Sequence, residues 1–502
     1  MYAVQQSVLN KHYTLKREKR IIVRKIPIAL LLILSLFLGF SISALALPKE
    51  QEHAIQSFVN EARRISGTSG ISASVVVDGE TYFFSSGLAN SEAETPADEE
   101  TLWELASVSK AFTALGVLYL EEQGLLSLDD SIADHLPWLT FWYRGQPVDM
   151  QGVRLYHFMH HTSGLLLNSE PGLTLQGGVE ALVNAELAFF PGESFAYGNG
   201  NYNILGLVIE TVSGQSYEAF MEEHIFRPLG MTQTFANRDY AVATGQFAQG
   251  YATQFIFFTV PRDARETESR VPTGFLISSA QDMARWMGIQ LGLVTDIPEI
   301  FHTIIPRTHE SGHWVVQWDG YYTAGWFVSA EGDRIDHGGL NHSFSTFALL
   351  LPEEQIGITV LANSCQTINA TLIADSIADI LGGDLEASYR MGGIQIMDVV
   401  FTLVTILGGA FAVIFFIFGL RRRKQDERQP RTKKRIVLII LWSVITLALI
   451  VFSYAFPRTI IPFGSWSFAL TLVSLSFLTA FVALALLSAS ITWFVAFPRR
   501  RE

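Results

Sequence analysis

Long hydrophobic stretches near both ends of the chain predict membrane segments. Four are long enough to cross a bilayer as helices of about 20 residues: residues 26–48, 395–420, 436–457 and 467–497. The first ends at Ala44-Leu45-Ala46, which is typical of a signal-peptidase site, whereas its length and the long basic segment before it are equally consistent with an uncleaved anchor. Both interpretations predict export of the region that follows.

Residues 49–394 alternate between helix-like and strand-like patterns. A helix is expected over residues 52–65, followed by two strands, residues 71–77 and 80–84, that flank the hairpin signal Asp78-Gly79. A further helix should run from residue 107 to residue 123 and stop at Gly124.

Strand patterns return near the end of this region. Residues 322–329, 343–351 and 355–362 read as strands, and residues 367–381 as a closing helix, while residues 202–212 form an apolar helix within the interior. Strands at both ends with helices between them predict an α+β domain, in which an antiparallel sheet is flanked by helices and carries an inserted helical lobe.

Composition narrows the class of protein. Of 502 residues, 49% are hydrophobic and 17% are charged, so the chain is too apolar to be disordered. The net charge of −13 lacks the basic footprint that nucleic acid requires, which excludes nucleic acid as the partner. The single cysteine, Cys365, excludes an intramolecular disulfide and a multi-cysteine zinc site.

The positive charges flank the hydrophobic stretches unevenly. Residues 1–25 carry seven Lys/Arg, the loop 421–435 carries nine, and the tail 498–502 carries three. By the positive-inside rule these three segments are cytoplasmic and residues 49–394 face outward. The sequence therefore predicts a multi-pass cell-membrane protein with an extracellular or periplasmic domain.

A serine and a lysine at the start of a predicted helix are the first candidates for chemistry. Ser107 and Lys110 lie three residues apart and so share one helix face. A lysine held in a pocket can lose its proton and activate a serine. Residues 49–394 hold only one other lysine, Lys49 at the boundary, against thirteen arginines. Retaining Lys110 in such a region favours a role in proton transfer over that of a surface charge.

Two further segments could contribute to the same site. Tyr197 and Asn199 are expected on a turn before the helix 202–212. His337 is followed by two glycines between two strands, and glycine permits close approach of the backbone to a ligand. Taken singly, the first segment is also consistent with a buried tyrosine beside an Asx turn, and the second with a plain hairpin bend.

The order Ser-x-x-Lys, Tyr-x-Asn, His-x-Gly resembles the serine β-lactamase and penicillin-binding-protein superfamily. The resemblance covers roughly residues 50–385 and is to the class C-like branch (peptidase S12 type), which holds class C β-lactamases, D-aminopeptidases and family VIII esterases. A narrower likeness is to membrane-bound prodrug-activating peptidases of the colibactin and zwittermicin type, which also carry three C-terminal membrane helices. The matching segments are residues 103–113, 143–147, 161–165, 228–231, 324–327, 337–339 and 357–363.

The resemblance implies an acyl-enzyme mechanism that needs no cofactor. Ser107 would be the nucleophile, and Lys110 and Tyr197 would share the general-base work, with Tyr197 returning the proton to the leaving amine. The backbone amides of Ser107 and Leu340 would form the oxyanion hole, with Gly339 beside them.

No metal site is predicted. His157, His160 and His161 have the helical spacing of metal ligands, but the resemblance assigns His161 to a structural turn.

Two departures from the family pattern bear on the substrate. His337 stands where typical β-lactamases and carboxypeptidases have a lysine that helps to hold a substrate carboxylate, so β-lactams and D-Ala-D-Ala ends are disfavoured. In the prodrug peptidases, polar residues of three segments hold a D-asparagine side chain. Asn341 matches one of them, whereas Asn199 and Arg270 stand where a serine and a histidine are expected, which leaves amide or anionic side chains as candidates.

These observations predict a membrane-bound serine peptidase or amidase that acts outside the cytoplasm. Its substrate would be a small molecule or peptide, such as a lipid-tailed conjugate, from which it removes an N-acyl-D-amino-acid cap. One alternative is a cell-wall D-peptidase, β-lactamase-like hydrolase or esterase, with Arg270 as the candidate cation near His337. A second is a non-catalytic sensor that binds cell-wall fragments and signals through the C-terminal helices.

Overall fold

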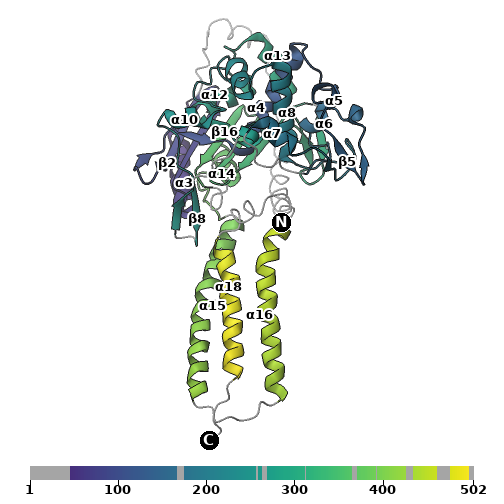
Figure 1. The fold of residues 1–502 in the computed structure, drawn as a ribbon. Coiled ribbons are helices and arrows are strands. Elements are labelled where there is room, and N and C mark those ends of the chain that lie inside the picture. Colours follow the sequence, from purple (N-terminus) through teal and green to yellow (C-terminus); the bar gives the residue numbers. More distant parts are fainter. Residues whose placement is uncertain are drawn as a thin grey trace, which may run out of the picture.

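A nine-stranded antiparallel sheet forms the centre of the domain in the computed structural model (Figure 1). The structure describes residues 46–166, 174–255, 258–262, 268–310, 312–364, 370–391, 393–424, 433–460 and 475–496. Cys365 and residues 1–45 lie outside this part of the chain. The strands follow the order β11 (His313–Val315), β12 (Gly320–Tyr322), β13 (Phe327–Ser329), β14 (Ile335–Leu340), β15 (Ser345–Leu351), β16 (Ile356–Ala362), β1 (Gly70–Val77), β2 (Glu80–Asn90) and β3 (Thr95–Pro96).

The predicted hairpin and the joining of distant strands are both confirmed. Asp78 and Gly79 connect β1 to β2 with positive φ angles of 51° and 84°, as a two-residue hairpin turn requires. On its other edge β1 pairs with β16, Ile71 lying opposite Ala362. Early and late parts of the domain are thus neighbours in one sheet, and the α+β class is correct.

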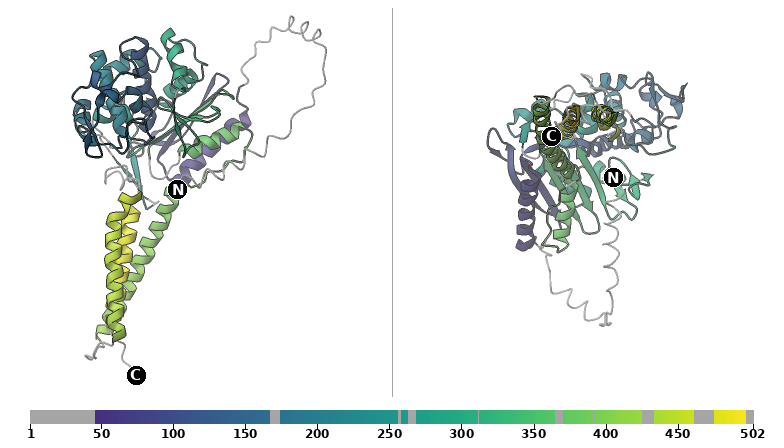
Figure 2. Two further views of the ribbon diagram at one scale, coloured as in Figure 1. Left: turned by 90° about the vertical axis from the view of Figure 1, so that its right-hand side faces the viewer. Right: turned by 90° about the horizontal axis from the view of Figure 1, so that it is seen from below.

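Two helices cover one face of the sheet, α3 (Lys49–Ser66) and α14 (Ala370–Leu381), which lie side by side in Figure 2. α3 is amphipathic, since its buried apolar residues recur at a spacing of three or four positions. Burying each such side chain stabilises the fold by about 1.5–3 kcal/mol. The cluster between these helices and the sheet includes Ile55, Phe58, Val59, Ile71, Ala73, Val75, Ile358, Val360, Ile373 and Ile377.

A helical lobe occupies the other face and contributes the larger hydrophobic cluster. Short two- and three-stranded ribbons connect parts of it, namely β4 (Leu102–Glu104) with β10 (Ile277–Ser279), β5 (Phe141–Tyr143) with β6 (Gln146–Pro147) and β7 (Ala185–Glu186), and β8 (Tyr251–Gln254) with β9 (Phe258–Pro261). Its helices are α4 (Ser109–Glu122), α5 (Ile132–His135), α6 (Leu155–Met159), α7 (Leu175–Glu180), α8 (Asn199–Ser213), α9 (Tyr217–Met221), α10 (Arg238–Ala243), α11 (Val271–Gly274), α12 (Ala280–Gln290) and α13 (Glu299–Arg307). Single helical turns are η1 (Ala106–Val108), η2 (Met150–Gly152), η3 (Glu222–Phe226) and η4 (Glu268–Arg270).

Three expectations about element boundaries are wrong. Ser107 lies in the turn η1, and the α-helix begins two residues later, at Ser109. Asn199 is the first residue of α8 rather than part of a preceding turn. Residues 322–329 form two strands instead of one, because Gly325 (φ 83°) bends the chain where it presses on α4; a Cβ there would lie 2.5 Å from the backbone of Ala111.

Three long helices follow the domain and extend away from it (Figure 1): α15 (Gly393–Lys424), α16 (Lys433–Ile460) and α18 (Leu475–Ala496). Hydroxyl side chains link α18 to both others, Thr405 to Thr479 at 3.1 Å and Thr446 to Ser488 at 2.8 Å. Within the described residues, one helical stretch, Gln395–Arg421, has the length and apolar composition to cross a membrane, whereas Ile436–Val451 and Thr479–Phe494 are shorter apolar segments.

Candidate active site

Ser107 lies at a strained turn where the sheet meets the helical lobe. The preceding residue, Ala106, has a φ of 46°, in the left-handed region that non-glycine residues seldom occupy. Such strain costs on the order of 1–3 kcal/mol and persists where the surroundings enforce it, commonly at functional sites. Ser107 itself is only half-buried, so its hydroxyl remains accessible in front of α4.

Lys110 points from the first turn of α4 into the protein and is completely buried. Its Nζ lies 3.1 Å from Ser107 Oγ, 2.9 Å from Asn199 Oδ1 and 2.6 Å from the carbonyl oxygen of Thr273. Burial lowers its pKa well below the ordinary value for lysine. Among the described residues, no carboxylate forms an ion pair with it.

A neutral Lys110 amine fits these three contacts. A neutral amine has two N–H groups and one lone pair. The oxygens of Asn199 and Thr273 can only accept, so they take both N–H groups. In the charged form the third N–H group donates to Ser107 Oγ. Once the amine is neutral, the lone pair occupies that position and faces Ser107 Oγ, which is the arrangement a general base requires.

Tyr197 packs against the amine of Lys110. Its ring centroid is 4.8 Å from Lys110 Nζ. Burial raises the pKa of its hydroxyl above the ordinary value, and the Ser107 hydroxyl partly offsets this rise. The site therefore pairs a lysine that loses its proton easily with a tyrosine that keeps its proton, and these are suitable as base and acid.

His161 packs against the ring of Tyr197 and is fully buried. Its ring lies 4.4 Å from that of Tyr197, and its Nδ1 faces the backbone amide of Gly198 at 3.3 Å and Asn201 Nδ2 at 2.9 Å. Burial, aided by the charge of Lys110, holds its pKa well below the usual value for histidine. His161 is therefore a neutral supporting residue, in agreement with the structural turn that the motif implied.

The strand β14 runs beside the turn that holds Ser107. A Cβ added to Gly339 would lie 2.1 Å from Thr346 Oγ1 and 2.5 Å from the carbonyl oxygen of Leu105, so only glycine fits. Thr346 in turn donates to that carbonyl at 2.6 Å. This close approach brings Leu340, the residue after Gly339, to the same side as the nucleophile, where its amide was predicted to share in an oxyanion hole.

His337 is buried on β14 and both of its ring nitrogens have partners. Its Nδ1 lies 2.8 Å from the carbonyl oxygen of Gly338, and its Nε2 lies 3.3 Å from the hydroxyl of Tyr322. Burial, followed by the charge of Lys110, lowers its pKa to about 3. His337 is thus neutral, and neither nitrogen is left for a substrate carboxylate.

Asn341 makes hydrogen bonds that hold the turn after β14. Its Oδ1 accepts from the amides of Ser343 and Phe344 at 3.0 and 2.8 Å, and its Nδ2 donates to Glu104 Oε2. Glu104, which also pairs with Arg238 at 2.6 Å, was not identified from the sequence, although it lies only three residues before Ser107. These contacts tie the β14 turn to the strand that leads to the nucleophile.

The remaining predicted residues come from the two segments next to Lys110. Asn199 Oδ1 accepts from Thr273 Oγ1 at 3.1 Å as well as from the lysine. Arg270 is half-buried in η4, three residues before Thr273, at the start of α11. Thr273 was missed by the sequence analysis because it acts through a backbone carbonyl, for which no side-chain motif exists.

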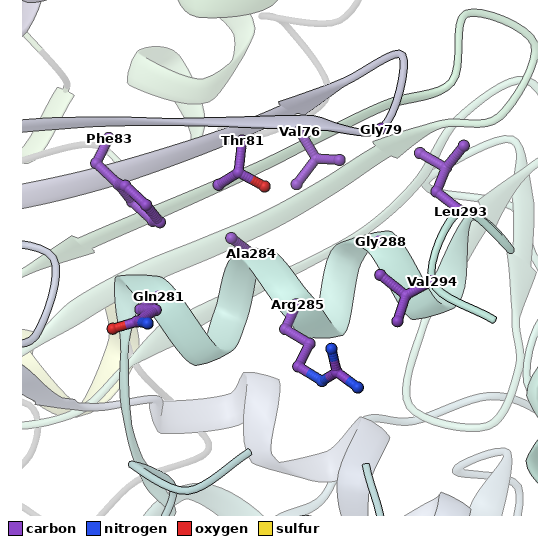
Figure 3. Close-up of a pocket in the computed structure, with 10 residues that line it drawn as sticks. All are labelled: Val76, Gly79, Thr81, Phe83, Gln281, Ala284, Arg285, Gly288, Leu293 and Val294. Atoms are coloured by element: carbon purple, nitrogen blue, oxygen red, sulfur yellow. The ribbon is translucent and has the colours of Figure 1, made fainter. Parts of the chain in front are cut away.

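A separate cavity of about 300 Å³ lies between the β1–β2 hairpin and α12 (Figure 3). It contains none of the candidate catalytic residues, and the guanidinium of Arg285 at its edge is already bonded to Leu229 O and Asp296. Its lining residues are Val76, Gly79, Thr81, Phe83, Gln281, Ala284, Arg285, Gly288, Leu293 and Val294.

The fold is that of the β-lactamase-like and penicillin-binding-protein-like serine hydrolases. Residues 55–380 match the Beta-lactamase family, and the chain therefore belongs to that family. Membership supports a hydrolase of the β-lactamase and D-alanine carboxypeptidase kind.

Known proteins similar to the chain agree with this family. Protein flp of Staphylococcus aureus (strain MW2) is 27% identical over 457 residues, which cover 87% of this chain and 90% of that protein. Penicillin-binding protein 4* of Bacillus subtilis (strain 168) is 37% identical over 164 residues, which cover 30% of this chain and 34% of that protein.

Two solved structures share the fold. The octameric penicillin-binding protein homologue from Pyrococcus abyssi superposes with a TM-score of 0.59 at 27% identity, covering 67% of this chain and 79% of that one. The β-lactamase/D-alanine carboxypeptidase from Pseudomonas syringae has a TM-score of 0.58 at 19% identity, covering 66% of this chain and 99% of that one, and it shows the fold alone.

Activity should rise with pH through the lowered pKa of Lys110. Protonation of the amine removes the lone pair that faces Ser107, so hydrolysis is lost as the pH falls through that pKa. An ordinary lysine titrates at about 10.4. The pH profile of kcat/KM on an uncharged substrate should therefore reach its plateau well below that value. A profile that keeps rising up to the ordinary lysine pKa would contradict a buried neutral base.

Proposed function

We propose that the protein is a membrane-bound serine amidase that works through an acyl-enzyme on Ser107. It removes an N-acyl-D-amino-acid cap from a small peptide conjugate outside the cytoplasm. The observation that carries the proposal is the geometry of Lys110, whose Nζ is held by two fixed oxygens and lies 3.1 Å from Ser107 Oγ, so that the lone pair of the neutral amine faces the serine.

The reaction follows from these positions. Lys110 takes the proton of Ser107 as Oγ bonds to the substrate carbonyl carbon, and the amides of Ser107 and Leu340 bind the developing oxyanion. Tyr197 delivers a proton to the amine as the C–N bond breaks, which leaves an ester on Ser107. Lys110 then passes the proton it took from the serine to Tyr197. Water attacks the ester as Lys110 takes a proton from the water, and that proton passes to Ser107 Oγ as the ester C–O bond breaks, so the acid departs and the serine is regenerated.

The lack of charge at His337 favours an amide substrate that has no carboxylate near this residue. His337 is neutral and both of its nitrogens are engaged. A D-asparagine preference is not part of the proposal, because Asn341 already uses its amide within the turn and on Glu104.

The membrane location rests on composition. The stretch Gln395–Arg421 has the length and apolar character of a spanning helix, and the basic segments on either side of the hydrophobic stretches favour an outward-facing domain. We include α16 and α18 in the membrane region, since hydroxyl pairs join them in a bundle with α15.

A second candidate function is trimming of cell-wall D-peptides or hydrolysis of β-lactams. The similarity to penicillin-binding protein 4* favours it. It requires a cation near His337 that binds the carboxylate of the substrate, and the neutral His337 does not fill this role.

The test uses intact cells that express the protein or its Ser107→Ala variant. Three substrates are offered, each with a sulfonated dye on its acyl side that prevents entry into the cytoplasm: an N-acyl-D-amino amide, a D-Ala-D-Ala peptide and a penicillin. We expect cleavage of the acyl amide by the wild type alone. Trapping by penicillin or release of D-alanine would transfer the assignment to the second candidate, and cleavage only after lysis would contradict an outward-facing site.

A further inference from the structure

Three half-buried aromatic side chains stand together beside the site. They are Phe195, two residues before Tyr197; Trp318, in the loop between β11 and β12; and Phe327, at the start of β13. The ring of Trp318 lies 5.6 Å from that of Phe195 and 4.1 Å from that of Phe327. Because these residues come from separate segments, the fold itself assembles this aromatic wall.

The aromatic wall is continuous with the catalytic residues. Phe327 lies 5.2 Å from the ring of His337, and Phe195 lies 5.6 Å from Tyr322, which is itself 6.1 Å from Tyr197. All these distances are in the range of direct ring contact. Each of the three wall residues is only partly buried, unlike the fully buried Tyr322 with which Phe195 and Phe327 are in contact.

The charged residues that neighbour the aromatic wall in sequence are acids. Glu193 precedes Phe195 by two residues, Asp319 follows Trp318, and both are exposed. His337 has no N–H to offer, since Gly338 O and the Tyr322 hydroxyl occupy its nitrogens. A carboxylate brought to this position would find no donor at His337, and the exposed acids that neighbour the wall in sequence add negative charge to this region.

We propose that Phe195, Trp318 and Phe327 form a subsite for an uncharged aromatic or bulky apolar group on the leaving amine of the substrate. The inference rests on the proposed function, in which Tyr197 delivers the proton to that amine, so a group attached to the nitrogen extends past Tyr197 and His337. The subsite would select aromatic amides and reject amides of amino acids that end in a free carboxylate.

The experiment compares three amides of one N-acyl-D-amino acid. Their leaving amines are benzylamine, 4-carboxybenzylamine and propylamine, so the first two differ only by a carboxylate remote from the reacting nitrogen. For the full-length protein in detergent, we expect kcat/KM for the benzylamide to exceed that of each other amide by about tenfold or more, the scale set by burying one ring against others.

Alanine variants of the wall residues test whether the preference for the benzylamide comes from the aromatic wall. Trp318→Ala and Phe327→Ala should each reduce the ratio of kcat/KM for the benzylamide to that for the propylamide to below about threefold, while hydrolysis of the propylamide continues. Two separate variants are used so that the test still stands if one of them fails to fold. The matched control is Trp314→Ala. Trp314 packs 5.0 Å from Tyr321, whose side chain points to the opposite face from that of Tyr322, and this variant should keep the wild-type ratio.

The outcomes separate the two proposals. Acylation of Ser107 by all three amides with similar kcat/KM, or a benzyl preference that survives both wall variants, would overturn the subsite and leave the proposed function standing. Absence of a Ser107 acyl-enzyme with every amide would overturn the proposed function and the subsite with it.

Discussion

Replacing Lys110 with methionine is expected to lower kcat/KM for amide hydrolysis by about 10²–10⁴-fold, the range of a lost general base. Methionine is unbranched, only one atom shorter than lysine and suited to a buried position, but its thioether is too weak a base to take the proton of Ser107. It also removes the lysine donor of the Thr273 carbonyl, at a cost of about 1–3 kcal/mol, whereas Asn199 Oδ1 keeps the Thr273 hydroxyl as a donor.

A matched lysine in the same domain provides the control. Lys49→Met removes the only other lysine of residues 49–394, which is exposed on α3, and should leave kcat/KM unchanged. Thermal unfolding of both variants distinguishes loss of the base from loss of the fold. If a folded Lys110→Met protein retained wild-type kcat/KM, another group would have to activate the serine.

Adding one methyl group at Gly339 is expected to lower kcat by about 10²–10³-fold, the effect of losing one oxyanion donor. The Cβ of alanine would lie 2.5 Å from the carbonyl oxygen of Leu105 and 2.1 Å from Thr346 Oγ1. The backbone carbonyl cannot rotate away, so β14 must move from the Ser107 turn and carry the amide of Leu340 with it.

The neighbouring glycine supplies the comparison. A Cβ at Gly338 would meet only the ring of Phe347, at 3.4 Å, so Gly338→Ala should retain most of the activity. Steady-state kinetics and thermal unfolding of both variants test this difference. Equal kcat values for folded Gly338→Ala and Gly339→Ala would show that the close approach of β14 to the nucleophile turn has no catalytic role.

The parts of the fold that depend on local pattern could be predicted from the sequence. The turn at Asp78-Gly79 and the two strands beside it follow from residue types a few positions apart. The pairing of β1 with β16 was expected only in general form, as a sheet closed by distant segments, and its register depends on packing across the whole domain. The break between β12 and β13 gave no local signal, because it arises where Gly325 meets α4.

In the candidate site, too, the features that depend on local sequence could be predicted and those that depend on distant packing could not. The motifs identified Ser107 and Lys110, which lie three residues apart and are joined in the structure. They did not identify the Thr273 carbonyl, since any residue can supply a backbone oxygen. They also assigned Asn341 to substrate binding from its position alone, whereas its contacts with Glu104 and its own turn depend on how β14 lies against β4.

The most direct test is whether Ser107 becomes acylated. Purified full-length protein is mixed with an N-acyl-D-amino amide, quenched at successive times and measured as intact mass, with peptide mapping of the adduct. We expect one acyl group per chain, located on the peptide that contains Ser107, absent from Ser107→Ala and formed about 10²–10⁴-fold more slowly in Lys110→Met. An adduct that survives in Ser107→Ala, or turnover with no adduct on the Ser107 peptide at any time, would contradict the mechanism.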